Sequence, residues 1–304
     1  MALFAPGGIR AGTSISIILC QNVDSWQQPR FLKSMKVPYI KAHGASNDFL
    51  LTWLTEAPTA DLPEVAKRIC DRYTGVGADG WLLVSPATNG ANYHGSIRLI
   101  NSDGSEAEIS GNGTRCAAAF LLNAGIGTTE ISILTGAGLK DLKVMSRHGL
   151  EWVFEMNMGK PQIAEGNLHF SLPMENGNQE ATILNVGNPQ CAVFVKDFDF
   201  DWKTLGARLE AHPHFPNKTN VSFIKPVDAH TIDVRFFERG AGVTMSSGTG
   251  STGAVVAAIL RGIAKSPVKV LTPAGPLDLT WKTRDADVFL VGPAEIVAAG
   301  DFFN

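Results

Sequence analysis

Apolar and polar residues alternate in short runs along most of the chain, which is the pattern of half-buried β-strands. A first series of strand-like runs covers residues 37–42, 48–54, 81–85, 96–101, 130–135, 141–147 and 151–156. A second series covers residues 181–186, 191–196, 220–225, 231–237, 268–271, 277–282 and 287–291. Because the series starts again after residue 157, the pattern predicts two similar halves built mainly from strands.

The helices predicted from the sequence are of two kinds. Residues 62–72 and 203–211 are amphipathic and belong at the surface, with Asp61 as a cap and Pro63 in the first turn of the earlier helix. By contrast, "CAAAFLLNAG" and "GAVVAAILRG" are apolar nearly all round, which is typical of helices buried on every side. We therefore predict an α+β fold in which each half is a curved, mostly antiparallel sheet or barrel wrapped around a buried central helix.

The spacing of matching motifs supports an internal duplication. "HGASNDFLL" and "VGNPQCAVFV" open the two halves in the same way. Asn47 precedes Ser110 by 110 − 47 = 63 residues, and Asn188 precedes Ser247 by 247 − 188 = 59 residues. We place the halves at residues 35–157 and 158–291. Residues 1–34 are expected to be a poorly ordered leader or a mis-assigned start, since the strand-like "MKVPYIKAHG" begins at residue 35.

Composition narrows the class of function. The 304 residues carry a net charge of −3 and are 44% hydrophobic and 18% charged, which is typical of a soluble globular protein and gives no electrostatic reason to expect nucleic acid or a membrane surface. The four cysteines show no paired spacing, so we expect reduced thiols in a cytoplasmic protein and no metal site. A small polar substrate suits this balance.

A serine and a glycine-rich turn introduce each central helix, in "EISGNGTRCAAAF" (108–120) and "TMSSGTGSTGAVVAAIL" (244–260). The first turn of a helix presents free N–H groups and the positive end of the helix dipole, and together these bind anions. A single turn of this kind is usually only a tight strand-to-helix connection. Two in equivalent places predict that both helix starts converge on one carboxylate in a cleft between the halves.

Other polar residues gather around each turn. In the first half they are Asn101, Asp103, Ser105, Ser110 and Asn112, and in the second half Glu238, Arg239, Ser246, Ser247 and Thr249. The adjacent Glu238 and Arg239 lie between apolar residues in "FFERGAG", so they are either substrate contacts or a structural ion pair. Asn47, Asn188 and Asn220 are either ligand contacts or turn residues.

From Met35 to Asn304 the chain resembles the diaminopimelate epimerase family. The matching stretches are "KAHGASNDF", "GVGADG", "INSDGSEAEISGNGTRC", "VGNPQCAV", "NVSF", "FFERGAGVTMSSGTG" and "VGPAEIV". The resemblance implies two pseudo-symmetric halves, with residues 292–304 returning to the first half as its last strand. It further implies a homodimeric, cofactor-independent isomerase of lysine and peptidoglycan biosynthesis. Such an enzyme interconverts LL- and meso-diaminopimelate with two bases on opposite faces of the α-carbon.

The resemblance also assigns roles to residues. Ser110 and Ser247 occupy the positions of the family's two catalytic cysteines, and Glu238 is a candidate to activate the serines. Gln190 replaces a family histidine, and Val243 replaces a glutamate. The backbone amides expected to hold the reacting carboxylate are those of Gly111, Asn112, Gly248 and Thr249. The residues expected to hold the rest of the substrate are Asn47, Asn101, Asn188, Asn220, Glu238 and Arg239, with Arg239 on the distal carboxylate.

Serine in place of cysteine leaves three hypotheses open, because an alcohol ionises far less readily than a thiol with a pKa near 8.5. In the first, the protein epimerises diaminopimelate with its serines activated by Glu238 and the helix ends. In the second, it is a related isomerase or dehydratase with altered acid–base chemistry. In the third, it binds a diamino acid and catalyses nothing. The family resemblance and the retained binding residues favour the first two hypotheses, whereas the two serines favour the last two. We take the epimerase as the prediction.

Overall fold

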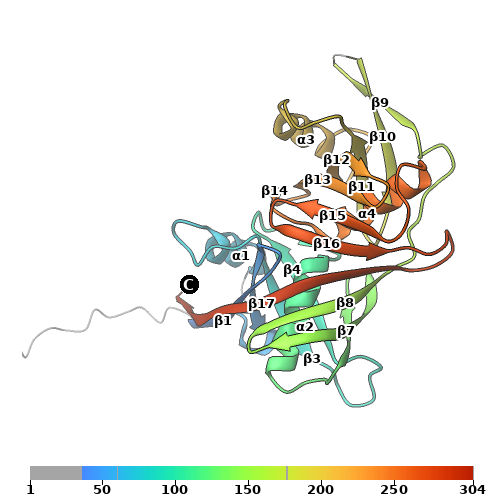
Figure 1. Cartoon of the computed structure of the whole chain (residues 1–304). Coiled ribbons are helices and arrows are strands. Elements are labelled where there is room, and N and C mark those ends of the chain that lie inside the picture. The colour runs from blue at the N-terminus through green and yellow to red at the C-terminus, as the bar shows by residue number, and fades with distance from the viewer. Residues whose placement is uncertain (1–35, 60, 176, 304) are drawn as a thin grey trace, which may run out of the picture. The chain divides into compact units, whose positions relative to one another are not determined.

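The computed structural model describes residues 36–59, 61–175 and 177–303. The segment expected to be a leader, residues 1–34, and Cys20 within it lie outside the described residues. The described residues form one unit in which two lobes are built on the same plan (Figure 1). The elements of the first lobe are β1 (Lys36–Gly44), β2 (Asn47–Trp53), the 3-10 turn η1 (Leu54–Glu56), α1 (Leu62–Cys70), β3 (Gly80–Pro86), β4 (Gly95–Asn101), β5 (Glu106–Ala107), α2 (Gly111–Asn123), β6 (Glu130–Thr135), β7 (Gly138–His148) and β8 (Glu151–Gly159).

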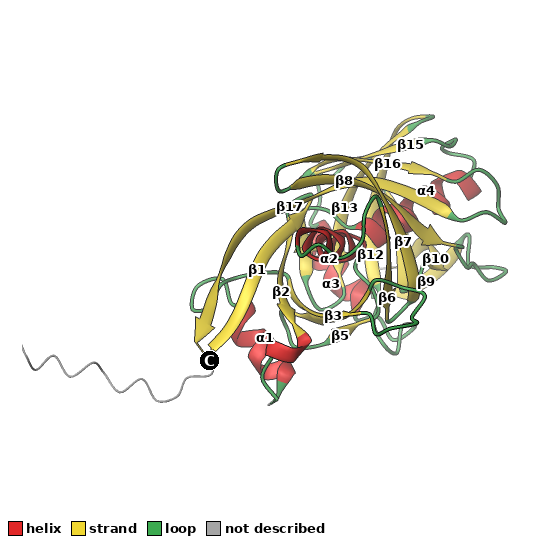
Figure 2. Ribbon diagram, turned by 90° about the horizontal axis from the view of Figure 1, so that it is seen from below, coloured by secondary structure: helices red, strands yellow, loops and turns green. Residues whose placement is uncertain are grey.

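A closed ring of strands surrounds α2 in the first lobe. The ring runs β1, β2, β3, β4, β6, β7, β8 and β17 (Val288–Phe303), and β17 pairs back to β1. Figure 2 shows α2 end-on inside this ring. The helix is buried from Gly111 to Leu121, which explains why its sequence is apolar on every side.

The second lobe repeats the plan. Its elements are β9 (Phe170–Met174), β10 (Gly177–Asn185), β11 (Pro189–Phe194), α3 (Trp202–Glu210), β12 (Asn220–Asp228), β13 (Thr231–Glu238), β14 (Gly242–Thr244), α4 (Gly248–Leu260), β15 (Val268–Thr272) and β16 (Gly275–Thr280). The pairings of β10 to β11, β12, β13 and β15 follow those of β1 to β2, β3, β4 and β6, including which pairs are parallel. Thirteen of the seventeen pairings among the described residues are antiparallel, so the predicted fold class is confirmed.

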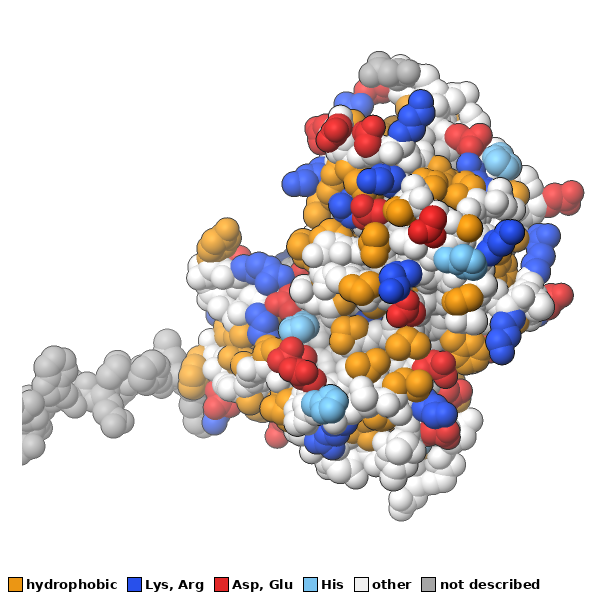
Figure 3. All heavy atoms as spheres, viewed as in Figure 1, with side chains coloured by type: hydrophobic (Ala, Val, Ile, Leu, Met, Phe, Trp, Pro, Cys, Tyr) orange, Lys and Arg blue, Asp and Glu red, His pale blue; other side chains and the backbone are white. Residues whose placement is uncertain are grey.

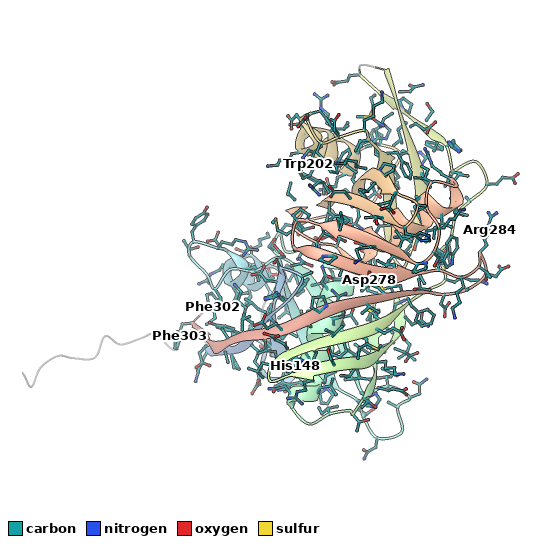
Figure 4. The ribbon with its side chains drawn as sticks, viewed as in Figure 1. His148, Trp202, Asp278, Arg284, Phe302 and Phe303 are labelled. Atoms are coloured by element: carbon teal, nitrogen blue, oxygen red, sulfur yellow. The ribbon has the colours of Figure 1, made fainter. Side chains whose placement is uncertain are left out.

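Strand β17 connects the two lobes. Its first residues pair with β16 and β8, and its second half pairs with β1. Figure 4 shows its course from near Arg284, at the edge of the second lobe, to Phe302 and Phe303 beside β1. The sequence pattern ended this strand at 291, whereas the paired strand continues through Gly292 and Pro293. The predicted divisions after residues 157 and 291 therefore lie inside β8 and β17.

The predicted cap at Asp61 is confirmed, and two of the cysteines lie in the core. Asp61 accepts a hydrogen bond from the amide of Glu64 at the start of α1. Cys116 and Cys191 are fully buried in the core, and burial raises the pKa of each thiol to about 12. Neither is therefore suited to act as a nucleophile at neutral pH. Among the described helices, none is long and apolar enough to cross a membrane.

Candidate active site

The two central helices meet at their N-terminal ends. A Cβ added to Gly111 would lie 3.0 Å from the Cα of Gly248, and one added to Gly248 would lie 2.9 Å from the Cα of Gly111. Ser110 and Ser247 are the N-caps: their Oγ atoms accept hydrogen bonds from the third amides of the helices, at 3.1 Å and 3.0 Å. Two positive helix ends in contact repel each other, so an anion at this point stabilises both.

We expect Gly248→Ala to destabilise this contact. The added methyl group meets the backbone of α2, which cannot rotate away, and overpacking of this kind costs about 1–3 kcal/mol of unfolding free energy. Gly253→Ala is the matched control in the same helix, since its Cβ meets side-chain atoms instead of backbone, with the Cγ of Gln190 at 3.1 Å. Chemical denaturation measures the unfolding free energy of both variants. Equal stability of the two variants would contradict a tight contact between the helix starts.

A carboxylate and a serine form a short hydrogen bond at the start of α4. Ser247 Oγ donates to Glu238 Oε1 at 2.5 Å, and Thr244 Oγ1 donates to Glu238 Oε2 at 2.8 Å. Burial raises the pKa of Glu238 to about 7, although both hydroxyl hydrogen bonds lower it. A carboxylate with this pKa is able to accept a proton near neutral pH and release it again.

The equivalent position in the first lobe lacks such a partner. Ser110 Oγ accepts from the Gly113 amide, and no described carboxylate hydrogen-bonds to it. In the second lobe, Gln190 donates to Asn188 Oδ1 at 2.6 Å, and its own Oε1 is buried without a partner among the described residues. The pseudo-symmetric site is therefore chemically asymmetric, with a basic group on the Ser247 side.

A small cavity of about 30 Å³ lies between the lobes at this point. Seven of the residues predicted from the sequence line it, namely Asn47, Asn101, Ser110, Asn188, Asn220, Glu238 and Arg239. The other predicted residues, Gly111, Asn112, Ser247, Gly248 and Thr249, are buried beside the helix starts without lining it. A cavity of this size holds about one or two water molecules, so a larger ligand does not fit in it in this conformation.

The four asparagines that line the cavity are all hydrogen-bonded within the protein. Asn101 donates to Ser105, and Asn188 donates to Thr249 at 3.3 Å. Asn220 accepts from the Arg239 amide at 3.0 Å and donates to the carbonyl oxygen of Pro189. The asparagines are therefore held in fixed orientations around the cavity.

Arg239 pairs with a residue that the sequence did not single out. Its guanidinium forms an ion pair with Glu108 of the first lobe and also donates to the Asn217 carbonyl at 3.3 Å. The alternative of a structural ion pair between Glu238 and Arg239 is wrong, because the Glu238 carboxylate faces Thr244 and Ser247 instead. Arg239 also lines an outer hollow of about 350 Å³, so its side chain stands between the cavity and the surface.

Asp79 is a further cavity residue that sequence reasoning missed. Its Oδ2 accepts from Asn47 Nδ2 at 2.6 Å, and Arg72 pairs with its other oxygen at 2.7 Å. Asp79 lies in the stretch "GVGADG", a motif of the family whose acidic residue is the signal that could have identified it. A larger hollow of about 670 Å³ lies in the second lobe near Trp281, and none of the predicted site residues lines it.

Solved structures of small-molecule epimerases and racemases share this fold. A hydroxyproline epimerase from Agrobacterium vitis matches with a TM-score of 0.65 at 15% identity, over 88% of this chain and 91% of that one. A probable proline racemase from Agrobacterium radiobacter matches with a TM-score of 0.66 at 15% identity, over 87% and 92%. At such low identity the likeness shows the fold alone.

Sequence comparison is more specific. The sequence pattern described as diaminopimelate epimerase matches residues 39–164 and 182–297. The diaminopimelate epimerase of Halothermothrix orenii is 35% identical over 280 residues, which cover 88% of this chain and 98% of that protein. Diaminopimelate epimerase 1 of Nostoc sp. is 36% identical over 285 residues, covering 88% and 99%. The chain therefore belongs to the diaminopimelate epimerase family.

Proposed function

We propose that the protein interconverts LL- and meso-diaminopimelate, in lysine and peptidoglycan biosynthesis, by proton transfer on both faces of the α-carbon without a cofactor. The observation that carries the mechanism is the 2.5 Å hydrogen bond from Ser247 to Glu238, whose pKa is about 7, beside two converging helix starts. In this arrangement the reacting carboxylate binds at the amides of Gly111, Asn112, Gly248 and Thr249. The negative charge that grows on it during catalysis is stabilised by the helix ends.

Glu238 and Ser247 act together on one face. The α-carbon–hydrogen bond breaks as its proton moves to Ser247 Oγ, while the hydroxyl proton of Ser247 moves along the short hydrogen bond to Glu238. The electron pair left on the α-carbon is delocalised into the substrate carboxylate. The carboxyl group of Glu238 then returns its proton to solvent when the lobes open.

Ser110 donates from the opposite face. Its hydroxyl proton moves to the α-carbon, and the oxygen that remains is stabilised by the amide of Gly113 and by the positive end of α2. Solvent reprotonates Ser110 after release of the product. The reverse reaction starts at Ser110, which lacks a carboxylate partner, so the two directions of the reaction use unequal bases.

The remaining cavity residues bind the rest of the substrate. We propose that Arg239 takes the distal carboxylate and exchanges Glu108 for it as the lobes close around the substrate. The side chains of Asn47, Asn101, Asn188 and Asn220 complete the binding site. Among the predicted site residues, the half-buried Glu238 combines a raised pKa with a hydroxyl partner.

The rate of LL-to-meso conversion is expected to rise with pH and to level off above about pH 7. Only the ionised form of Glu238 accepts a proton, and burial raises its pKa from the ordinary 4.5 to about 7, so the base is lost as the pH falls through 7. Chiral chromatography of the product between pH 5 and 9, expressed as kcat/KM, measures this. A rate that is already level at about pH 5.5 would show that another group is the base.

One observation favours a second candidate function. Because no described carboxylate contacts Ser110, a protein that moves protons on the Ser247 face alone is also consistent with the geometry. Such a protein is a related isomerase or dehydratase acting on an amino acid or dicarboxylate. In deuterated water this second kind of protein would label the substrate without inverting it, whereas an epimerase inverts the α-carbon.

We further propose that the protein is a cytoplasmic homodimer and that its substrate is a small diamino dicarboxylate, as the family implies. On the face shown in Figure 3, acidic and basic side chains are interspersed, so that face offers a polyanion no extended binding surface. Sedimentation analysis of the full chain measures the oligomeric state, and a monomer at all concentrations would contradict the dimer.

A further inference from the structure

Arg115 is a fully buried guanidinium inside the first lobe, one turn into α2. It fills a slot lined by glycines: a Cβ added to Gly292 would lie 3.0 Å from its Cζ, and one added to Gly44 would lie 3.2 Å from its Nη2. Its Nε donates to the carbonyl of Pro293 in β17 at 3.0 Å. Because glycine has no side chain, Gly44 and Gly292 leave the space that the Arg115 guanidinium occupies.

No carboxylate neutralises the charge of Arg115 within the part of the chain that the structure describes. Its three hydrogen bonds go to neutral oxygens, those of Pro293, Gly111 and the Asn112 side chain, and no ion pair between described residues includes it. Burial lowers the pKa of Arg115 to about 10, so the guanidinium remains charged at neutral pH. A buried charge without a counter-ion is costly unless an anion binds nearby.

Arg115 is also the first member of a directed chain of hydrogen bonds. Its Nη2 donates to Asn112 Oδ1 at 2.5 Å, Asn112 Nδ2 donates to Asn47 Oδ1 at 3.0 Å, and Asn47 Nδ2 donates to Asp79 Oδ2 at 2.6 Å. Because a guanidinium only donates and a carboxylate only accepts, the two ends fix which way both amides point. Asn112 also donates to the carbonyl of Ser246 at 3.1 Å, which connects the chain to the second lobe.

We propose that Arg115 is a positioning residue for the reaction: its unpaired buried charge strengthens the anion site at the starts of α2 and α4, and its bond to Asn112 sets the orientation of Asn47 in the cavity. Arg115 does not line the cavity, so it acts through the helix start rather than by touching the substrate. The inference rests on the proposed function in one respect, that the bound anion is the substrate's reacting carboxylate.

Arg115→Gln, Arg115→Lys and the control Arg261→Gln test this role. Arg261 is an almost fully buried arginine beyond the other end of α4, where it pairs with Glu180. Calorimetric titration with LL-diaminopimelate gives affinity, α-proton exchange gives kcat, and thermal denaturation gives stability. We expect Arg115→Gln to lower affinity at least about tenfold and kcat by a further tenfold, since the carboxylate charge grows as the proton leaves.

The charge-preserving variant separates electrostatics from folding. Arg115→Lys is expected to retain affinity and kcat to within about fivefold, and Arg261→Gln is expected to change neither. Equal losses in Arg115→Lys and Arg115→Gln, or unchanged affinity in Arg115→Gln, would overturn the inference. Should Arg115→Gln not fold, the lysine variant decides alone, and a loss of affinity or kcat beyond about fivefold overturns the inference. Binding that depends on Arg115 without any exchange would contradict the proposed function and not this inference.

Discussion

Glu238→Gln is expected to lower kcat for α-proton exchange by about 1,000-fold, within the range that general-base removal usually costs. The amide keeps an acceptor oxygen for one of the two hydroxyls, Ser247 or Thr244, and presents an N–H donor to the other, but it cannot take a proton. Because the substitution removes a carboxylate whose burial disfavours its charge, we expect the thermal stability to stay the same or to rise. Deuterium incorporation at the α-carbon, followed by mass spectrometry, measures the rate.

Asp233→Asn is the matched control for Glu238. It removes a carboxylate from the same strand, where Asp233 pairs with Arg235 and does not line the cavity. We expect its kcat to equal that of the parent protein. Activity in Glu238→Gln within about threefold of the control would rule out Glu238 as the base.

The double substitution Ser110→Cys/Ser247→Cys is expected to raise the exchange rate at least about 100-fold. A thiol has a reference pKa near 8.5, and helix N-termini lower it further, whereas an alcohol stays almost entirely protonated. Both hydroxyls stand at such N-termini. The rate is measured by the same deuterium incorporation, over a range of pH.

Ser110→Ala/Ser247→Ala controls for the loss of the caps. Removing each cap is expected to cost about 1 kcal/mol of stability, because the amides of Gly113 and Gly250 lose their acceptors. We expect this variant to show no exchange above background. A cysteine variant no faster than the parent protein would contradict proton transfer at these two positions.

The sequence was sufficient to predict the repeated architecture and both central helices, because their apolar patterns are long and differ clearly from those of surface helices. It was insufficient for β5, β9 and β14, which have two to five residues and too little alternation to be recognised. It also placed the apolar helices after the glycines, whereas α2 and α4 begin at Gly111 and Gly248 because the preceding serines cap them.

The other features that could not be predicted depend on contacts between residues that are distant in sequence. The continuation of β17 through Gly292 and Pro293 depends on pairing with β8, which no local pattern encodes. Glu108, Asp79 and Arg115 lie within the motifs typical of the family, but their partners are 131, 32 and 178 residues away in sequence. Their importance becomes visible only when the lobes bring the two helix starts together.

Proton transfer on both faces is measured most directly by incubating the protein with LL-diaminopimelate in deuterated water and analysing the first products. We expect meso-diaminopimelate with deuterium at the inverted α-carbon, while the LL-isomer that remains is still unlabelled. This pattern arises because one group removes the proton and a different group delivers the deuteron. Label in the LL-isomer without formation of the meso-isomer would contradict transfer on two faces, and no label in either would contradict catalysis.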